Sequence, residues 1–425
     1  MTHGVMRRRM LACRRAPTAI GRLWGPSASK TDAEGDENHE HFDPIDQETM
    51  NPRISSHFDG GAITVQDTSR TDDLQVALRP DSHADIRQWF YFRLQGAAGR
   101  TARIRITNAG EATYADGWPG YAAVASYDRA NWFRVPTSYD GNELVIEHTP
   151  LRDSIYYAYF EPYSWERHLD LLGRADASPL ARVGDLGATV EGRDLNVVTV
   201  GTPGEGRKSL WFIARQHPGE TMAEWFVEGM LDRLLDGSDP VARGLLARAV
   251  LHIVPNMNPD GGVRGNLRTN AAGANLNREW MAPSLERSPE VLHVRAAMQA
   301  AGVDAFLDVH GDEALPYVFT DGNERLANYS PRMAALEQGF RAALQFANPD
   351  FQMVHGYAAD KETKVNLTIA SKWVGHTFGG LSLTLEMPFK DNAERPDPLH
   401  GWNGARSRRL GGDALTALYA MLPSL

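Results

Sequence analysis

A histidine and a glutamate three positions apart, with a turn-forming pair between them, constrain this chain more than any other feature. In His217-Pro218-Gly219-Glu220 both polar side chains can point at one metal ion. Imidazole nitrogen and carboxylate oxygen suit zinc, and a catalytic zinc usually takes three protein ligands and leaves one position for water. His310 is the best candidate for the third ligand, because it follows an apolar run that predicts a buried strand. The sequence therefore predicts a metal centre just beyond strand ends.

Further polar residues follow in an order that fits such a centre. Arg268 and the pair Asn277-Arg278 lie between the two histidines, and Glu386 ends a late apolar run, Leu383 to Leu385. Each has a structural alternative, since Asn277-Arg278 could be a helix cap with a solvated arginine and Glu386 a salt-bridged strand end. Together, metal ligands, arginines and a strand-end glutamate favour a zinc peptidase that binds a carboxylate group of its substrate.

That order resembles the zinc metallocarboxypeptidases, and most closely their cytosolic carboxypeptidase subgroup, in a bacterial form. The resemblance covers roughly residues 55 to 420. It is carried by His217 to Glu220, Pro255 to Gly262, Gly265 to Arg268, Gly273 to Trp280, Asp308 to Gly311 and Thr384 to Glu386. Upstream, Gln88 to Arg93 and Ala158 to Tyr163 resemble signatures of that subgroup's amino-terminal domain.

The resemblance implies one zinc ion per chain, bound by His217, Glu220 and His310. Peptide hydrolysis also needs a base that takes a proton from the attacking water and passes it to the leaving amine. Glu386 is the candidate by its place at the end of the late strand, and the resemblance gives it the same role.

Three further residues acquire roles from the resemblance. It places Arg268 beside the scissile carbonyl, where a fixed positive charge stabilises the developing oxyanion. It places Asn277 and Arg278 on the terminal carboxylate of the substrate, which a guanidinium can grip with two parallel bonds. The implied activity is removal of carboxyl-terminal residues from peptide or protein tails.

The chain departs from the family pattern at three places. Asn275 stands where many relatives have an aspartate that accepts a hydrogen bond from a zinc-bound imidazole. Gly219 stands where the pancreatic enzymes have an arginine. Those enzymes also use a mobile tyrosine about 22 residues before the glutamate, but here that stretch is Lys361 to Lys364, and Tyr357 is only nearby.

Lysines before Glu386 bear on specificity. Lys361, Lys364 and Lys372 could make the pocket for the last side chain cationic and favour terminal glutamate or aspartate, or they could be solvated loop residues. The subgroup resemblance independently implies acidic specificity, because its members trim glutamates. His355 and His376 flank the same loop and could line the cleft.

Composition excludes several other classes of protein. The net charge of −10 argues against a general nucleic-acid binder, and no run of about 18 apolar residues predicts a membrane span. The single cysteine, Cys13, cannot form an internal disulfide, and the basic start is not typical of a secretory signal. We therefore expect a cytoplasmic protein.

The chain is expected to form an α/β fold preceded by an antiparallel β-sandwich. Residues 1–49 are polar and charged, which predicts a disordered tail. Residues 50–166 show short alternating runs separated by turns, which predicts the sandwich. Residues 167–425 alternate strands with helices, which predicts a carboxypeptidase-like mixed sheet flanked by helices.

Two rival functions remain open at this stage. The same zinc site could serve an amidase or deacylase of small acyl-amino acids, or a hydrolase of peptidoglycan peptides. Alternatively the chain could be a binding protein that has lost catalysis. Arg268, Asn277 and Arg278 favour substrates with a free carboxylate, and the presence of Glu386 favours an active enzyme.

Overall fold

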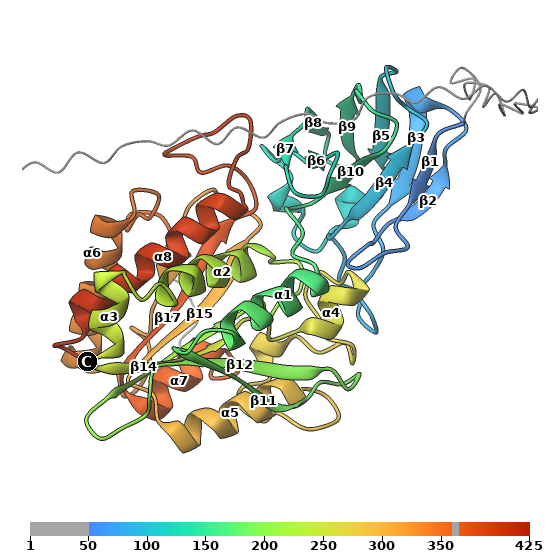
Figure 1. Ribbon diagram of the computed structural model, residues 1–425. Helices are drawn as coiled ribbons and strands as arrows, with labels where there is room; N and C mark the ends of the chain where they lie inside the picture. Colours follow the sequence, from blue (N-terminus) through green and yellow to red (C-terminus); the bar gives the residue numbers. More distant parts are fainter. Residues whose placement is uncertain (1–50, 359–364) are drawn as a thin grey trace, which may run out of the picture. The chain divides into compact units, whose positions relative to one another are not determined.

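The computed structural model describes residues 51–358 and 365–425, so the predicted tail, residues 1–49, lies outside the described residues. Three β-sheets account for the strands of this part of the chain. Two of them come from the first hundred or so described residues, and the third, larger sheet comes from the part of the chain that follows (Figure 1).

The first two sheets form the predicted sandwich, which we define as residues 53–158. One sheet has the order β1 (Arg53–Ser55), β4 (Tyr91–Gln95), β10 (Ile155–Ala158), β6 (Val124–Ser126), β7 (Phe133–Arg134). The other has the order β2 (Thr64–Asp67), β3 (Leu74–Ala77), β5 (Ala102–Ile106), β9 (Leu144–His148), β8 (Thr137–Tyr139). Short 3-10 turns stand at η1 (Thr71–Asp73), η2 (Ala109–Glu111) and η3 (Ala115–Gly117).

Buried and exposed side chains alternate along the strands, which explains why the two sheets pack face to face. In β5 the residues Ala102, Ile104 and Ile106 are fully buried while the arginines between them are partly exposed. A period of two places one face of a strand in the core and the other in water. Strand pairing is antiparallel as predicted except between β3 and β5, which run parallel.

The third sheet has seven strands and is mixed, as predicted. Its order is β11 (Ala181–Ala188), β12 (Asp194–Val200), β14 (Ala249–Val254), β13 (Lys208–Ala214), β15 (Ala305–Asp312), β17 (Leu381–Pro388), β16 (Phe319–Asp321). The four strands from β14 to β17 in this order are parallel to one another, and the remaining pairs are antiparallel. Parallel strands are covered on both faces, so they carry nearly continuous apolar runs.

Eight helices and one further 3-10 turn are described. They are α1 (Trp165–Asp176), α2 (Met222–Leu234), α3 (Pro240–Leu246), α4 (Pro259–Arg264), η4 (Leu276–Arg278), α5 (Pro289–Ala301), α6 (Pro331–Ala347), α7 (Ala370–Phe378) and α8 (Gly404–Met421). No helix among the described residues is long and apolar enough to cross a bilayer.

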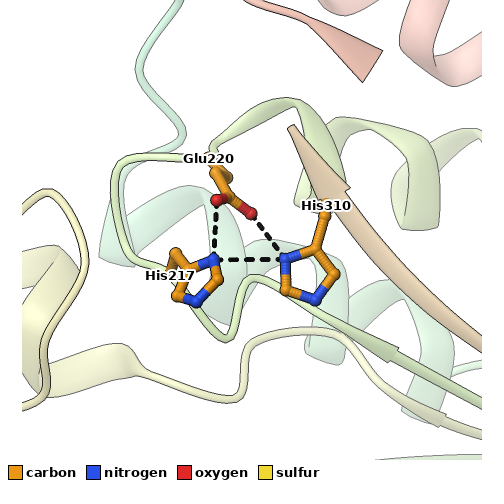
Figure 2. Close-up of side chains that lie close together, drawn as sticks. All are labelled: His217, Glu220 and His310. Carbon is orange, nitrogen blue, oxygen red and sulfur yellow. Dashed lines mark hydrogen bonds and ion pairs between the residues drawn. The ribbon is translucent and has the colours of Figure 1, made fainter. Parts of the chain in front are cut away.

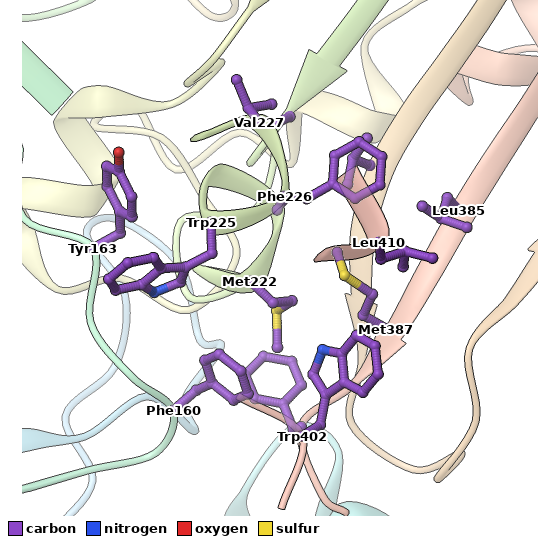
Figure 3. Close-up of a cluster of buried hydrophobic side chains, with 14 of the residues drawn as sticks. Phe160, Tyr163, Met222, Trp225, Phe226, Val227, Leu385, Met387, Trp402 and Leu410 are labelled. Atoms are coloured by element: carbon purple, nitrogen blue, oxygen red, sulfur yellow. The ribbon is translucent and has the colours of Figure 1, made fainter. Parts of the chain in front are cut away.

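The two faces of the third sheet bury different helices. Leu210 and Phe212 of β13 point into the large core with α2 and α8, whereas Trp211 and Ile213 point into a smaller core with α5 and α7. Figure 3 shows part of the large core, where side chains of α2, β17 and α8 meet those of the segment after the sandwich; the labelled ones are Phe160, Tyr163, Met222, Trp225, Phe226, Val227, Leu385, Met387, Trp402 and Leu410. This packing fixes the strand ends that carry the polar residues.

Candidate metal centre

The three predicted metal ligands converge at the carboxyl ends of β13 and β15. His217 and Glu220 lie on the short loop between β13 and α2, and His310 lies within β15 (Figure 2). One ligand atom from each residue lies within 4.8 Å of the other two. Ligand sites in open α/β sheets lie beyond the carboxyl ends of the strands, as this group does.

The distances between ligand atoms fit a zinc ion. Nδ1 of His217 and Nδ1 of His310 are 3.2 Å apart, and they lie 2.6 and 2.8 Å from the two carboxylate oxygens of Glu220. Two nitrogens each about 2.0–2.1 Å from a tetrahedral ion stand about 3.3 Å apart. The nitrogen pair therefore already has the separation that zinc requires, and all three side chains are at least 97% buried.

The opposite ring nitrogen of each histidine faces an acceptor. Nε2 of His217 lies 3.0 Å from Oδ1 of Asn275, and Nε2 of His310 lies 2.9 Å from Oδ1 of Asp308. The other oxygen of Asp308 accepts a hydrogen bond from Gln216 Nε2 at 2.8 Å. Such partners hold the tautomer that leaves Nδ1 free for a metal. Asn275 thus contacts the His217 imidazole although it is not an aspartate, while the charged partner of this metal group is Asp308.

The three side chains of the metal group shift one another's pKa values. Burial lowers the pKa of His217 to about 3, and the nearby Arg268 guanidinium lowers it further, so this imidazole is neutral. Burial alone lowers the pKa of His310, but Asp308 and Glu220 outweigh it and the pKa is raised well above its usual value. Burial raises the pKa of Glu220, but the two imidazoles outweigh it and the pKa is lowered. A carboxylate held ionised between two imidazoles supplies the charge that a divalent ion needs.

Glu386 faces the same space from the next strand. It is the register partner of His310 in the parallel pair of β15 and β17, and 94% of it is buried. Burial raises its pKa well above the usual value, and the opposing effect of His310 is smaller. Its Oε1 accepts a hydrogen bond from the Tyr357 hydroxyl at 2.9 Å, and its Oε2 has no hydrogen-bond partner among the described residues.

A cleft of about 1350 Å³ opens over these residues. Its walls include Arg268, Asn277 and Arg278, the loop 351–358, and residues 112–116 of the sandwich. Nη1 of Arg268 lies 3.8 Å from Glu220 Oε1. Asn277 accepts a hydrogen bond from the Ala370 amide at 2.8 Å, so its oxygen anchors the start of α7. The predicted residues therefore gather around one cleft.

Of the three lysines that were predicted to bear on specificity, one lies within the described residues. Lys361 and Lys364 lie outside the described residues. Lys372 lines the cleft, but its Nζ lies 2.8 Å from Asp321 Oδ2, so a carboxylate offsets its charge. His355 lines the cleft and stacks on Tyr317 at 4.1 Å between ring centroids, whereas His376 is exposed and does not line the cleft.

Sequence reasoning missed several residues of the site. Asp308 has a detectable signal, because residues i and i+2 of a strand share a face and Asp308 stands two before His310. Tyr357 is 29 positions before Glu386 rather than about 22. Tyr114 and Asp81 come from the sandwich and carry no local motif, so only the fold brings Tyr114 to the cleft and Asp81 to the backbone of Arg268.

A mixed sheet with a buried His-Glu-His group at its strand ends, open to a cleft, defines the class as a metal-dependent hydrolase. Two family models match the chain: the cytosolic carboxypeptidase N-terminal domain over residues 54–160, and zinc carboxypeptidase over residues 167–395. The chain belongs to the zinc carboxypeptidase family and is a zinc metallocarboxypeptidase of the cytosolic carboxypeptidase type.

Solved structures agree with this assignment. A metallo-carboxypeptidase from Burkholderia cenocepacia is 55% identical, with 88% of this chain and 99% of that one covered at a TM-score of 0.85. A metallo-carboxypeptidase from Pseudomonas aeruginosa, solved with (2-guanidinoethylmercapto)succinic acid, is 46% identical, with 88% and 99% covered at a TM-score of 0.85.

Curated relatives divide into two kinds. An uncharacterized protein of Zymomonas mobilis is 46% identical over 88% of this chain and 98% of its own length. Cytosolic carboxypeptidase 1 of Mus musculus is 26% identical over 67% of this chain, which spans only 27% of that protein. The match to the mouse enzyme therefore concerns one part of a much longer chain.

Proposed function

We propose that this enzyme removes the last residue from peptide or protein tails in the cytoplasm, with a preference for glutamate or aspartate. The observation that carries the proposal is the group of His217, Glu220 and His310, whose ligand atoms lie within 4.8 Å of one another beside Glu386. In this proposal the three residues hold one zinc ion. Zinc, when bound, supplies a Lewis acid for the scissile carbonyl and lowers the pKa of a water ligand.

Glu386 is the base in this scheme. Its Oε2 has no hydrogen-bond partner among the described residues, so it is available to accept a proton from the attacking water. Its place beside His310 on the adjacent strand lets it take that proton next to the metal group and pass it to the leaving amine. The Tyr357 hydroxyl orients the other oxygen by donating to Oε1.

The arginines bind the two charged parts of the substrate. Arg268, whose side chain is only 14% exposed, is the donor to the oxyanion that develops on the carbonyl. Arg278 lines the same cleft and is more exposed, which suits a group that captures the terminal carboxylate as the substrate arrives. Asn277 adds an amide donor beside it. The neighbour from Pseudomonas aeruginosa supports carboxylate capture, because its bound compound contains a succinic acid group.

The acidic preference is the finer part of the proposal. Arg341 and Lys372 line the cleft, and Lys361 and Lys364 stand in the sequence between its lining residues Ala358 and Val365. An acidic side chain entering a cationic pocket finds a partner there, while an apolar one leaves the buried charge unpaired. Acidic partners oppose this effect, since Asp321 already pairs with Lys372 and Glu324 with Arg341.

The test is a release assay on peptides that differ only in the last residue: glutamate, leucine or lysine. We expect the largest kcat/KM for glutamate and no release after zinc is removed with a chelator, with recovery on adding zinc back. A preference for lysine would assign the pocket to Asp321 and refute the acidic preference while leaving the carboxypeptidase intact.

A further inference from the structure

The loop that carries Arg268 is held by a carboxylate of the sandwich. Asp81, which is 94% buried, accepts three successive backbone amides: Leu267 on Oδ1 at 2.6 Å, and Arg268 and Thr269 on Oδ2 at 2.8 and 2.9 Å. Its Oδ2 also accepts from the Thr269 hydroxyl at 3.1 Å. Hydrogen bonds to an ionised acceptor are about twice as strong as neutral ones, so Asp81 fixes the backbone on both sides of Arg268.

The same loop contacts the metal-ligand loop. The carbonyl of Leu267 accepts a hydrogen bond from the Gly219 amide at 2.8 Å. A Cβ on Gly219 would lie 3.0 Å from that carbonyl oxygen and 3.2 Å from the Leu267 Cα, so the two loops are as close as a glycine allows. A side chain at position 219 would therefore crowd the backbone of Leu267. Asp81 therefore acts on a loop that lies directly against His217 and Glu220.

A second sandwich residue lies against the Arg268 side chain itself. The guanidinium carbon is 5.2 Å from the centre of the Tyr114 ring, within the range of a cation–π interaction. Tyr114 is held in turn by Gln88, a fully buried residue whose side chain bonds both the amide and the carbonyl of Tyr114, at 2.9 and 3.1 Å. The ring is thus presented to the cleft by a rigid part of the sandwich.

We propose that Asp81 and Tyr114 are positioning residues for Arg268, so that the sandwich completes the active site. Asp81 sets the backbone of Arg268 and Tyr114 restricts its long side chain, which otherwise has many rotamers. A preorganised donor stabilises developing charge without reorganising during the reaction. This inference rests on the proposed function, because it takes Arg268 as the oxyanion donor.

The central experiment is a double-mutant cycle in the full-length zinc enzyme. Asp81→Asn keeps the shape of the side chain but presents an NH₂ group to backbone amides that need an acceptor. Removing an oxyanion donor costs about 10²- to 10³-fold in kcat, so we expect about that loss for Arg268→Ala and at least a tenfold loss for Asp81→Asn. KM and zinc content should stay within about twofold, since the lost interaction acts in the transition state. In the Arg268→Ala background, Asp81→Asn should cost nothing further.

Asp59→Asn is the matched control. Asp59 also belongs to the sandwich and accepts a backbone amide from the second part of the chain, that of Trp165 at 2.8 Å. Among the described residues, its hydrogen bond goes to Trp165 and not to the Arg268 loop. We expect it to retain native kcat. If Asp81→Asn lowers the melting temperature or zinc content, the comparison of Tyr114→Leu with Tyr114→Phe carries the test instead: the ring-free variant should lose kcat and the phenylalanine should restore it.

The results distinguish the proposed role of Arg268 from the proposed positioning roles of Asp81 and Tyr114. If Arg268→Ala keeps native kcat, the proposed role of Arg268 fails. If Arg268→Ala loses activity but Asp81→Asn and Tyr114→Leu do not, the role of Arg268 stands and the positioning inference is wrong. A full loss from Asp81→Asn in the Arg268→Ala background would likewise overturn it, because the aspartate would then act through another group.

Discussion

His310 and Glu386 are register partners on the adjacent parallel strands β15 and β17. Partner residues in a parallel pair present their side chains on the same face of the sheet, about one strand spacing apart. The pairing therefore places the proposed base beside a proposed metal ligand without any contribution from a loop. Because both strands are buried along their whole length, this relationship is fixed by the core.

Glu386→Gln should keep zinc and lose nearly all turnover. The amide has almost the same shape and can still accept from Tyr357, but it cannot take a proton from water. General acid–base catalysis is worth about 10²- to 10⁴-fold, so kcat should fall by that factor. The measurement is kcat together with zinc content by metal analysis. Retention of more than about a tenth of the native kcat would rule out the proposed base.

Asp308→Asn should weaken zinc binding while the fold persists. Asp308 faces Nε2 of His310, and loss of such a partner typically costs about 10- to 100-fold in metal affinity. Competition with a chromophoric chelator gives the zinc Kd. Asp304→Asn is the control, because Asp304 lies just before the same strand and bonds Ser209 and Lys208 away from the site. Equal affinities for the two variants would contradict the role of Asp308.

Glu290→Gln should flatten the dependence of stability on pH. Burial raises the pKa of Glu290 to about 7, although the Asn270 amide at 3.2 Å opposes the shift. A pKa raised on folding gives stability that is complete below the unfolded value, near pH 4.5, and is lost as pH rises to about 7. The native enzyme should therefore lose up to about 3 kcal/mol over this interval relative to the variant.

Urea unfolding of both proteins at several pH values checks this prediction. The exposed Glu286→Gln serves as the control and should follow the native curve. Parallel curves for the native enzyme and Glu290→Gln would show that the carboxyl stays ionised in the folded state.

Local sequence patterns predicted the metal group and the sheet well. His217, Glu220, His310 and Glu386 each stand at or just after an apolar run, and strand ends of a parallel sheet meet at one edge. The role of Arg268 came from the family resemblance, and no local pattern indicated what holds its loop. Its anchor, Asp81, is 187 positions away and belongs to a different sheet, so no spacing rule could connect them.

The pocket for the last side chain was the least predictable part of the site. Lys372 was expected to add positive charge, but Asp321 on β16 lies against it. That pairing depends on β16 joining the edge of β17 in antiparallel register, a contact between segments about sixty residues apart. Charge counting along the chain cannot find such partners, because neutralisation is set by the fold.

The measurement that tests the central claim most directly compares one peptide as its free acid and as its carboxyl-terminal amide, with the native zinc enzyme. Arg278 would lose its charged partner on the amide, and a hydrogen bond to a charged group is worth about 1.5–3 kcal/mol. We predict that kcat/KM falls about 10- to 150-fold on amidation, and that Arg278→Ala removes most of this difference. Equal rates on the two peptides would contradict carboxypeptidase action and point to an amidase or endopeptidase.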